Sequence, residues 1–308
     1  MRILVLGCKG QLGRCLNDQL SNTDHDVIYT SREQIDITYF EVTKNSLLAI
    51  APDVVINASA YTEVDKAEED HEAADLINHL AVGNIADTCK QMDCWLIQIS
   101  TDYVFDGNSE VPYKESDQTN PQGVYGETKL NGELAIQASG CKHIIIRTAW
   151  VFSEYGNNFL KTMLRLGTER NELSIVGDQI GCPTYAQDIA KAIIAILPKL
   201  NSQEGLNGIY HFCGDSACSW FEFADAIFEH IAKVGTKSPK IIHSIKTSDY
   251  PTAAKRPIYS VLNCESFYED FGIKQSDWIS GIKSALARIL CDQTFASHSN
   301  LQILTEKR

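Results

Sequence analysis

Several features that would assign this chain to other classes of protein are missing from its sequence. No apolar run reaches the roughly 18 residues that a membrane-spanning helix needs. The ten cysteines include no C-x-x-C pair, and there is no internal repeat or low-complexity linker. Basic residues are scarce, with 27 Lys and Arg against 40 Asp and Glu and a net charge of −13. We therefore expect no membrane and no nucleic acid among the partners, because nucleic acid needs a basic surface.

The N-terminal sequence and the cysteines bear on the compartment of the protein, and the net charge bears on its ligands. The apolar stretch at residues 1–7 is too short for a signal peptide, so we expect a cytoplasmic protein. Its cysteines are then expected to be reduced thiols that serve as small hydrophobic residues. The acidic excess would also disfavour anionic ligands if it lay evenly over the surface, but a net charge does not describe one pocket.

The first half of the sequence alternates short apolar runs with amphipathic stretches. The apolar runs lack polar alternation, as expected for strands of a sheet that is buried on both faces. Strands alternating with helices imply βαβ units with right-handed crossovers and a parallel sheet. The predicted strands are 2–6, 26–30, 53–57, 94–100 and 143–147. The predicted helices are 11–20 and 39–50, and a long helical region is predicted over roughly 64–91.

After about residue 150 the pattern loosens. One helix is predicted to begin at Ser219, with Glu222 in the capping-box position. The other predicted elements are helices at 158–166, 185–197 and 278–290 and a strand at 241–245.

These elements predict an α/β fold with two parts. Residues 1–150 are expected to form a doubly wound parallel, Rossmann-type sheet, to which later segments return. Residues 151–291 are expected to form a smaller α/β C-terminal lobe that binds substrate. Residues 292–308 have no clear period and are expected to be a loose tail.

A glycine-rich loop lies between the first predicted strand and the first predicted helix. Gly7, Gly10 and Gly13 are spaced G-x-x-G-x-x-G. Glycines let a backbone turn sharply and approach a pyrophosphate, and a helix N-terminus supplies N–H donors and the positive end of a dipole. In this strand–turn–helix context, the loop indicates a dinucleotide-binding site more strongly than a plain tight turn.

The end of the second predicted strand bears on the choice of cofactor. An acidic residue there would bind a ribose 2′-hydroxyl, whereas a basic residue would accept a 2′-phosphate. Ser31 and Arg32 favour NADPH, but Glu33 follows directly, so NADH stays possible. Arg32 could equally be a solvated surface charge.

Tyr125 and Lys129 are spaced i and i+4 and so share one face of a helix. Thr101 lies before them at the carboxyl end of the fourth predicted strand, where ligands of doubly wound sheets bind. A neighbouring ammonium would lower the pKa of the Tyr125 phenol and make proton transfer feasible at neutral pH. Thr101 could hydrogen-bond a carbonyl oxygen that is being reduced. The alternative is an exposed Tyr–Lys pair beside a capping threonine.

With these residues assembled, the chain resembles the extended short-chain dehydrogenase/reductases and, among them, the dTDP-4-dehydrorhamnose reductase family. The resemblance covers nearly the whole chain. Its specific parts are Tyr-Thr-x-Val-Asp-x-Ala-Glu at 61–68 and Thr-Asp-Tyr-Val-Phe at 101–105. Sugar-nucleotide epimerases of the same superfamily usually carry Gly-Phe-Ile-Gly where this chain has Gly-Gln-Leu-Gly at 10–13.

The resemblance implies the last step of dTDP-L-rhamnose synthesis, in which NADPH or NADH reduces the C4 ketone of dTDP-4-dehydro-L-rhamnose. Tyr125 would protonate the C4 oxygen, Lys129 would lower the pKa of Tyr125 and hold the nicotinamide ribose, and Thr101 would complete the catalytic set. The expected cofactor-binding residues are Gly7, Gly10, Gln11, Leu12, Gly13, Ser31, Arg32, Asp36, Ile37, Ala58, Ala60, Tyr61, Thr62, Tyr125 and Lys129. The expected substrate-binding residues are Val64, Thr101, Asp102, Tyr103, Trp150 and, against the nucleotide phosphates, Arg256.

The chain departs from the family pattern at Cys15. Some family members carry a Glu there, two residues beyond the last loop glycine, and it binds Mg²⁺ at a dimer interface. With a cysteine at this position, we expect no structural metal and a possible homodimer that is not bridged by one.

Other interpretations stay open. Val64 and Trp150 could be core residues, Asp102 could only fix its own loop, and Arg256 could be a surface charge. The chain could be another sugar-nucleotide reductase or epimerase. It could also be a non-enzymatic NADP-binding regulatory subunit, similar to that of methionine adenosyltransferase, although an intact catalytic set disfavours that role.

Overall fold

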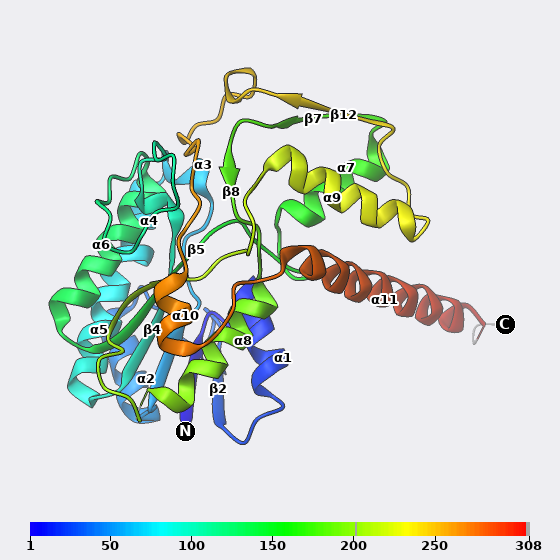
Figure 1. Cartoon of the computed structure of the whole chain (residues 1–308). Helices are drawn as coiled ribbons and strands as arrows, with labels where there is room; N and C mark the ends of the chain where they lie inside the picture. The colour runs from blue at the N-terminus through cyan, green and yellow to red at the C-terminus, as the bar shows by residue number, and fades with distance from the viewer. Residues whose placement is uncertain (201, 306–308) are drawn as a thin grey trace.

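A parallel six-stranded sheet forms the centre of the computed structural model, which describes residues 1–200 and 202–305. Its strands lie in the order β10-β5-β4-β3-β1-β2, and each neighbouring pair is parallel (Figure 1). The strands are β1 (Arg2–Leu6), β2 (Asp26–Thr30), β3 (Val54–Asn57), β4 (Trp95–Thr101), β5 (Lys142–Thr148) and β10 (Gly208–His211). The predicted doubly wound α/β fold is confirmed, and β10 is a segment of the second half that returns to the sheet.

Helices cover both faces of this sheet. On one face lie α1 (Gln11–Leu20) and α8 (Ala186–Ile196), and on the other lie α2 (Phe40–Ile50), α5 (Ala81–Met92) and α6 (Val124–Ser139) (Figure 1). The pleat divides β1 between these faces, because Ile3 and Val5 belong to one apolar cluster and Leu4 and Leu6 to the other. Burial on both faces explains why the strands read as continuous apolar runs.

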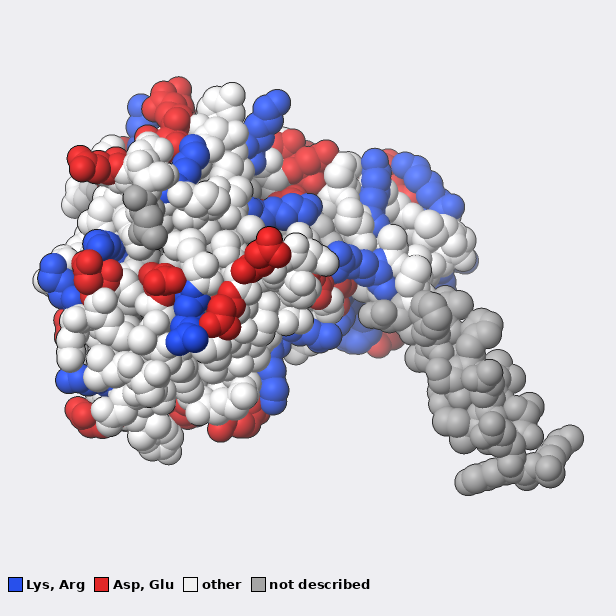
Figure 2. Space-filling model, turned by 90° about the horizontal axis from the view of Figure 1, so that it is seen from below, with Lys and Arg blue, Asp and Glu red and all other residues white. Residues whose placement is uncertain are grey.

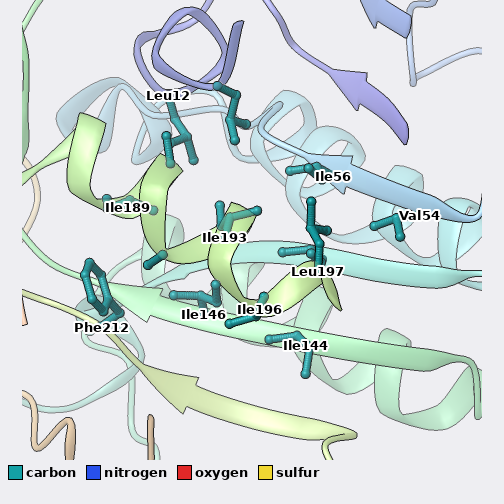
Figure 3. Packing of buried hydrophobic residues seen from close by; sticks show 14 of the residues in the cluster. Leu12, Val54, Ile56, Ile144, Ile146, Ile189, Ile193, Ile196, Leu197 and Phe212 are labelled. Carbon is teal, nitrogen blue, oxygen red and sulfur yellow. The ribbon is translucent and has the colours of Figure 1, made fainter. Parts of the chain in front are cut away.

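The core between α8 and the sheet follows helical periodicity. Ile189, Ile193 and Ile196 lie on one face of α8 and pack toward Ile144 and Ile146 of β5 (Figure 3). Each of these side chains is buried, and full burial of an isoleucine stabilises a fold by about 2 kcal/mol. This packing fixes the sheet whose carboxyl edge carries the candidate site.

The helical region predicted over residues 64–91 is confirmed, but it is divided into several helical segments. The chain there forms α3 (Val64–Ala67), α4 (His71–Asp75), the π-helical turn η1 (Leu76–Leu80) and then α5. The buried Asn78 of η1 uses its side chain to bind the Tyr61 backbone. Close packing of α6 adds to this constraint, because a Cβ on Gly132 would collide with the Asn78 carbonyl oxygen. Tertiary contacts therefore override the apolar period of this segment.

A smaller lobe stands over the carboxyl edge of the sheet (Figure 1). The capping box predicted at Ser219 and Glu222 is confirmed at the start of α9. The short 3₁₀ turns of the chain are η2 (Asp102–Val104), η3 (Leu197–Lys199) and η4 (Thr247–Asp249). The other elements are β6 (Val151–Phe152), α7 (Phe159–Glu169), β7 (Glu172–Val176), β8 (Ile180–Gly181), β9 (Thr184–Tyr185), β11 (Cys218–Ser219), α9 (Trp220–Lys233), β12 (Ile241–Ile245) and α10 (Glu265–Phe271).

The last helix, α11 (Trp278–Thr305), is longer than predicted and leads away from the lobe (Figure 1). Its first half packs through Ile282, Ala285 and Leu286, and no Gly or Pro interrupts the sequence from 282 to 305. Residues 292–305 continue this helix and residues 306–308 lie outside the described part, so the loose tail stays a prediction. Within the described residues, no helix is both long and apolar enough to cross a bilayer.

Charged side chains of both signs are interspersed on the face seen from below (Figure 2). The acidic excess of the chain does not gather there into a single patch. Charge around a ligand is consequently set by individual side chains and not by a general field on this face.

Candidate active site

The glycine loop joins β1 to α1 through conformations that only glycine tolerates. Gly7 has a φ of +77°, and a Cβ at this position would lie 2.7 Å from the Ser59 Oγ. A Cβ on Gly13 would collide with the Gly7 carbonyl oxygen, so α1 can begin directly against the loop. Gly10 caps α1 without a side-chain hydrogen bond, and the first turn of α1 contains no acidic residue. The N–H groups at this helix end are therefore free of side-chain acceptors and suited to a phosphate.

A cavity of about 300 Å³ opens beside this loop. Apolar side chains, including Ile35 and Ile77, and the hydroxyl of the buried Ser31 give it the mixed lining that an adenosine needs. The predicted cofactor-binding residues that line it are Gly7, Gly10, Ser31, Arg32, Asp36, Ile37, Ala58 and Ala60. The loop, the open helix end and the cavity together fit the adenosine and pyrophosphate parts of a dinucleotide.

Each cation at the rim of this cavity has an acidic partner. Lys9 lies 3.0 Å from Glu33, and Arg32 lies 3.0 Å from Asp36. Both basic side chains are exposed and can turn toward a 2′-phosphate. Lys9 lies inside the glycine motif but was not among the predicted binding residues, because such a motif draws attention to its glycines.

Three predicted contacts are limited to the backbone or do not reach the cavity. The Gln11 side chain is engaged elsewhere, since its Oε1 accepts hydrogen bonds from Ser153 and Asn158. Leu12 is buried in the core. Both residues keep only their N–H groups for a phosphate. Thr62 is exposed and does not line the cavity.

Asn78 connects the cavity to the catalytic side chains, and sequence reasoning missed it. Its Oδ1 accepts a hydrogen bond of 2.9 Å from the Tyr61 backbone, and its Nδ2 donates to the Tyr61 carbonyl and to the Thr128 hydroxyl of α6. A polar residue inside an apolar helical stretch was the available signal. The π-helical turn η1 that carries it is a feature frequent at functional sites.

The predicted catalytic side chains come together at the carboxyl end of β4. Thr101 ends β4, and its hydroxyl lies near enough to Tyr125, in the first turn of α6, to lower the pKa of that phenol. Tyr125 also packs edge-on against Tyr103, with ring centroids 5.5 Å apart. The buried Lys129 lies one turn further along α6, and its Nζ donates to the Ile99 carbonyl at 2.6 Å.

The pKa values of these groups differ from expectation in one respect. Burial raises the pKa of Tyr125 above its ordinary value, and the group that lowers it is the Thr101 hydroxyl. Lys129 was expected in that role, but its ammonium faces a carbonyl instead. Burial lowers the pKa of Lys129 to about 8, and Glu133 opposes this change.

Asp102 is a buried carboxylate directly behind Thr101. It is only 2% exposed, and its Oδ1 accepts a hydrogen bond of 3.0 Å from the Thr101 hydroxyl. Its Oδ2 has no partner among the described residues. Burial raises the pKa of Asp102 to about 6, and the Ser260 and Thr101 hydroxyls oppose this change. A carboxylate left half-satisfied in this place can accept a hydrogen bond from a hydroxyl-bearing ligand.

Arg256 reaches this site from the lobe but is already paired. Its NH2 lies 2.6 Å from Asp65 Oδ2, and its NH1 donates to the Tyr103 hydroxyl at 3.1 Å. Asp65 also accepts a hydrogen bond from the Ala254 backbone, so it anchors this segment twice. Burial raises the pKa of Tyr103 to about 12. Asp65 was missed as a site residue, although it lies within the 61–68 motif.

Trp150 and Val64 are both half-buried. Trp150 has a φ of +47°, a strained conformation for a bulky residue. Its indole stacks on Trp220 with ring centroids 3.5 Å apart, and a Cβ on Gly181 would lie 2.5 Å from it. Val64 begins α3 and is half-buried. Trp220 was missed, because its role depends on stacking with a residue far away in the sequence.

Cys15 is fully buried and faces the interior. Burial raises the pKa of its thiol, which keeps it in the neutral form. In the part of the chain that can be described, no group of three or more His, Cys, Asp or Glu is arranged to hold a metal ion. The absence of a structural metal stays a prediction.

A larger, open hollow of about 770 Å³ lies between the segments around Gly214, Leu262 and Gln275. It contains none of the predicted site residues. The cofactor is assigned to the smaller cavity, because that cavity adjoins the glycine loop and the carboxyl ends of the strands.

Comparisons with known proteins agree on one family. The model of the RmlD substrate binding domain family matches residues 1–291. A dTDP-4-dehydrorhamnose reductase of Aggregatibacter actinomycetemcomitans is 42% identical over 93% of this chain and 98% of its own length. The Escherichia coli K12 enzyme of the same name is 39% identical over 93% and 97%. A Bacillus anthracis dTDP-4-dehydrorhamnose reductase solved with NADP has a TM-score of 0.86 at 34% identity, covering 93% of this chain and 99% of its own.

Proposed function

The chain belongs to the RmlD substrate binding domain family, and from this membership we infer that it reduces the C4 ketone of dTDP-4-dehydro-L-rhamnose to give dTDP-L-rhamnose. It is an NADP-dependent oxidoreductase, and NADH is a possible second reductant. The observation that carries this function is the approach of Thr101 and Tyr125, one turn from Lys129 and at the same edge of the sheet as a nucleotide-sized cavity.

The cofactor, when bound, supplies the hydride. Tyr125 donates a proton to the C4 oxygen, and burial keeps this phenol in its neutral, proton-donating form at neutral pH. Thr101 hydrogen-bonds the same oxygen and stabilises the negative charge that develops on it. Lys129, one turn further along the same helix, binds the nicotinamide ribose hydroxyls through its ammonium.

The remaining predicted residues bind the two ligands. The α1 N-terminus and the glycine loop bind the pyrophosphate, and Arg32 and Ser31 bind the 2′-phosphate. Asp102, Tyr103 and Trp150 bind the sugar together with Val64 at the start of α3. Arg256 exchanges Asp65 for the nucleotide phosphates, since a guanidinium binds both carboxylate and phosphate in a forked geometry.

Turnover with a panel of ketosugars tests this function. NADPH consumption is expected with dTDP-4-dehydro-L-rhamnose and is compared with UDP- and GDP-linked 4-ketosugars. A sugar-nucleotide epimerase would convert its substrate without net loss of NADPH. A regulatory subunit would bind NADPH tightly and turn over none of these compounds.

Tyr125→Phe tests the role of the phenol. The turnover rate is expected to fall by about 10²-fold or more, while NADPH affinity stays nearly unchanged, as for the loss of a general acid. Tyr29→Phe is the matched control, because the Tyr29 hydroxyl is buried without a partner in the described structure and lies outside the site. Equal turnover of Tyr125→Phe and the wild type would remove Tyr125 from this role.

The state of the cysteines bears on the compartment of the protein. All ten cysteines are free thiols, and most are buried, which favours a reducing compartment such as the cytoplasm. A homodimer without a bridging metal stays a prediction from the sequence.

A further inference from the structure

A fully buried ion pair lies directly behind Lys129. Arg147 of β5 donates to Glu133 of α6 through NH2 at 2.6 Å and through Nε at 3.0 Å, which is a bidentate geometry. The two side chains are 3% and 1% exposed. Ser100 adds a hydrogen bond from its hydroxyl to Glu133 Oε1. Ser100 directly precedes Thr101 in β4, and Glu133 lies one helical turn after Lys129 in α6. The network therefore adjoins both of these catalytic residues.

Stability alone does not account for this pair. Removing two charges from water costs several kcal/mol per ion, and an apolar pair of similar volume is often as stable or more so. A buried ion pair so close to a reacting centre is therefore a candidate for a role in the electrostatics of that centre.

Charged and titratable groups surround Lys129 on several elements. On α6 itself are Tyr125 and Glu133, and the carboxylate of Glu68 accepts a hydrogen bond from the α6 N-terminus at Val124. Asp102 of η2 lies behind Thr101. The remaining charged or titratable groups of the network are Arg147 of β5 and His211 of β10.

His211 does not supply a charge to this network. Its Nε2 lies 3.5 Å from Arg147 NH1, and its Nδ1 faces the carbonyls of Tyr113 and Asn263. Burial and the nearby guanidinium lower the pKa of His211 to about 3, so the ring is neutral at working pH. The carboxylate that shares a helix face with Lys129 is Glu133, which lies four residues further along α6.

We propose that Glu133, held in place by Arg147 and Ser100, is a positioning residue that keeps Lys129 in its charged form for the reaction. The proposal rests on the function proposed above, because it concerns the state of Lys129 in that reaction. The Lys129 ammonium is buried and donates to a carbonyl, so it has no carboxylate in direct hydrogen-bond contact among the described residues. The Glu133 carboxylate, one turn away, compensates the positive charge of Lys129 without forming a direct hydrogen bond to the ammonium. Because Arg147 and Ser100 occupy the Glu133 oxygens, Lys129 stays free to contact ligands.

The direction of the pKa change at Lys129 agrees with this arrangement. Burial lowers the pKa of Lys129, and Glu133 is the group that raises it. Loss of the carboxylate would leave burial unopposed, and the ammonium would lose its proton at a lower pH.

Glu133→Gln tests the proposal, because it removes the charge at nearly constant volume. The alkaline limb of the pH profile of kcat/KM is expected to move to lower pH by about one pH unit. Glu133→Asp, which keeps the charge, is expected to leave the limb near its wild-type position. An unchanged limb in Glu133→Gln would overturn the proposal.

A double variant separates charge from folding. Glu133→Gln leaves Arg147 buried and unpaired, so it is also expected to destabilise the fold. Glu133→Gln with Arg147→Met replaces the whole pair by uncharged side chains and is expected to recover stability. The alkaline limb should stay shifted in this double variant. Recovery of a wild-type pH profile together with stability would mean that the pair only supports the fold, and would overturn the proposal.

An NMR titration of the Lys129 side chain in the cofactor-free protein provides a readout that is independent of turnover. Its signal is assigned by comparison with Lys129→Arg. In Glu133→Gln the Lys129 midpoint is expected to move to lower pH by the same amount as the limb. A shifted midpoint in a protein that fails to reduce any ketosugar would refute the proposed function but support the link between Glu133 and Lys129. An unshifted midpoint would overturn that link, whatever the turnover.

Discussion

Replacing Asp102 by Asn is expected to stabilise the protein at neutral pH while impairing its site. The carboxylate is almost fully buried, and one of its oxygens has no partner in the described structure. Burial raises its pKa from the ordinary value of 3.8 to about 6. Because a tenfold change in proton affinity is worth about 1.4 kcal/mol, keeping this group ionised costs the folded state on the order of 3 kcal/mol.

The sign of this effect depends on pH. A pKa that is higher in the folded than in the unfolded state favours folding when the group is protonated, and this advantage is lost as the pH rises through the folded value. The Asp102 penalty is therefore absent below about pH 4, partly developed at pH 5 and complete above about pH 7. Asp102→Asn removes it, so the gain in stability should grow over the same range.

Urea unfolding at pH 5 and pH 8 measures this gain. At pH 8 the free energy of unfolding should rise by on the order of 3 kcal/mol, and at pH 5 by about half of that. For a chain of this length, the change corresponds to an increase in Tm of about 4 °C. Turnover should fall, because the oxygen that is free to bind substrate has been replaced.

Asp106→Asn is the matched control on the same segment. Asp106 accepts hydrogen bonds from the Asn108 backbone and the Tyr113 hydroxyl, and these lower its pKa. Loss of its charge should therefore reduce stability at neutral pH, the opposite direction from Asp102→Asn. A loss of stability in Asp102→Asn that is equal at both pH values would refute the reasoning, because it would mean that the carboxylate is satisfied in the folded protein.

Two further predictions concern the ligands. Arg32→Ala should raise the KM for NADPH about tenfold and leave that for NADH nearly unchanged, because only NADPH carries the 2′-phosphate; equal effects on both would place Arg32 outside the cofactor site. Gly181→Ala should push the Trp150 indole from its position and raise the KM for the sugar nucleotide without changing NADPH binding, since the added Cβ would lie 2.5 Å from the ring. Gly208→Ala is its control, because a Cβ there meets no atom within 4 Å; identical kinetics of the two variants would show that Trp150 does not touch the substrate.

Much of the sheet could be predicted from the sequence because its strands are short apolar runs, and those at its centre are buried on both faces. The predicted strand at 26–30 coincides with β2, and that at 2–6 with β1. The helical region at 64–91 could be predicted, but not its π-helical turn η1, where the Asn78 side chain contacts Tyr61 and Thr128. Apolar periodicity does not contain such tertiary information.

Only some of the site residues could be predicted from the sequence. Gly7, Tyr125 and Lys129 could be proposed because their spacing is local. Asp65 and Arg256 are 191 residues apart, and their pairing emerges only when the lobe meets the sheet. The ion pair of Glu133 and Arg147 joins a helix to a strand, so neither residue carried a signal on its own.

The acidic partners of Lys9, Arg32 and Arg256 have a consequence for how the protein meets its ligands. Each cation offered to a phosphate already holds a carboxylate, so binding of a polyanion is an exchange of one anion for another. The gain in binding free energy is then the difference between the attraction of the cation for the phosphate and its attraction for the carboxylate. This difference is smaller than either attraction alone. Dissolved salt weakens both sides of such an exchange together. A chain with 13 excess acids can thus receive two highly charged ligands at a site that is close to electrical balance before they arrive.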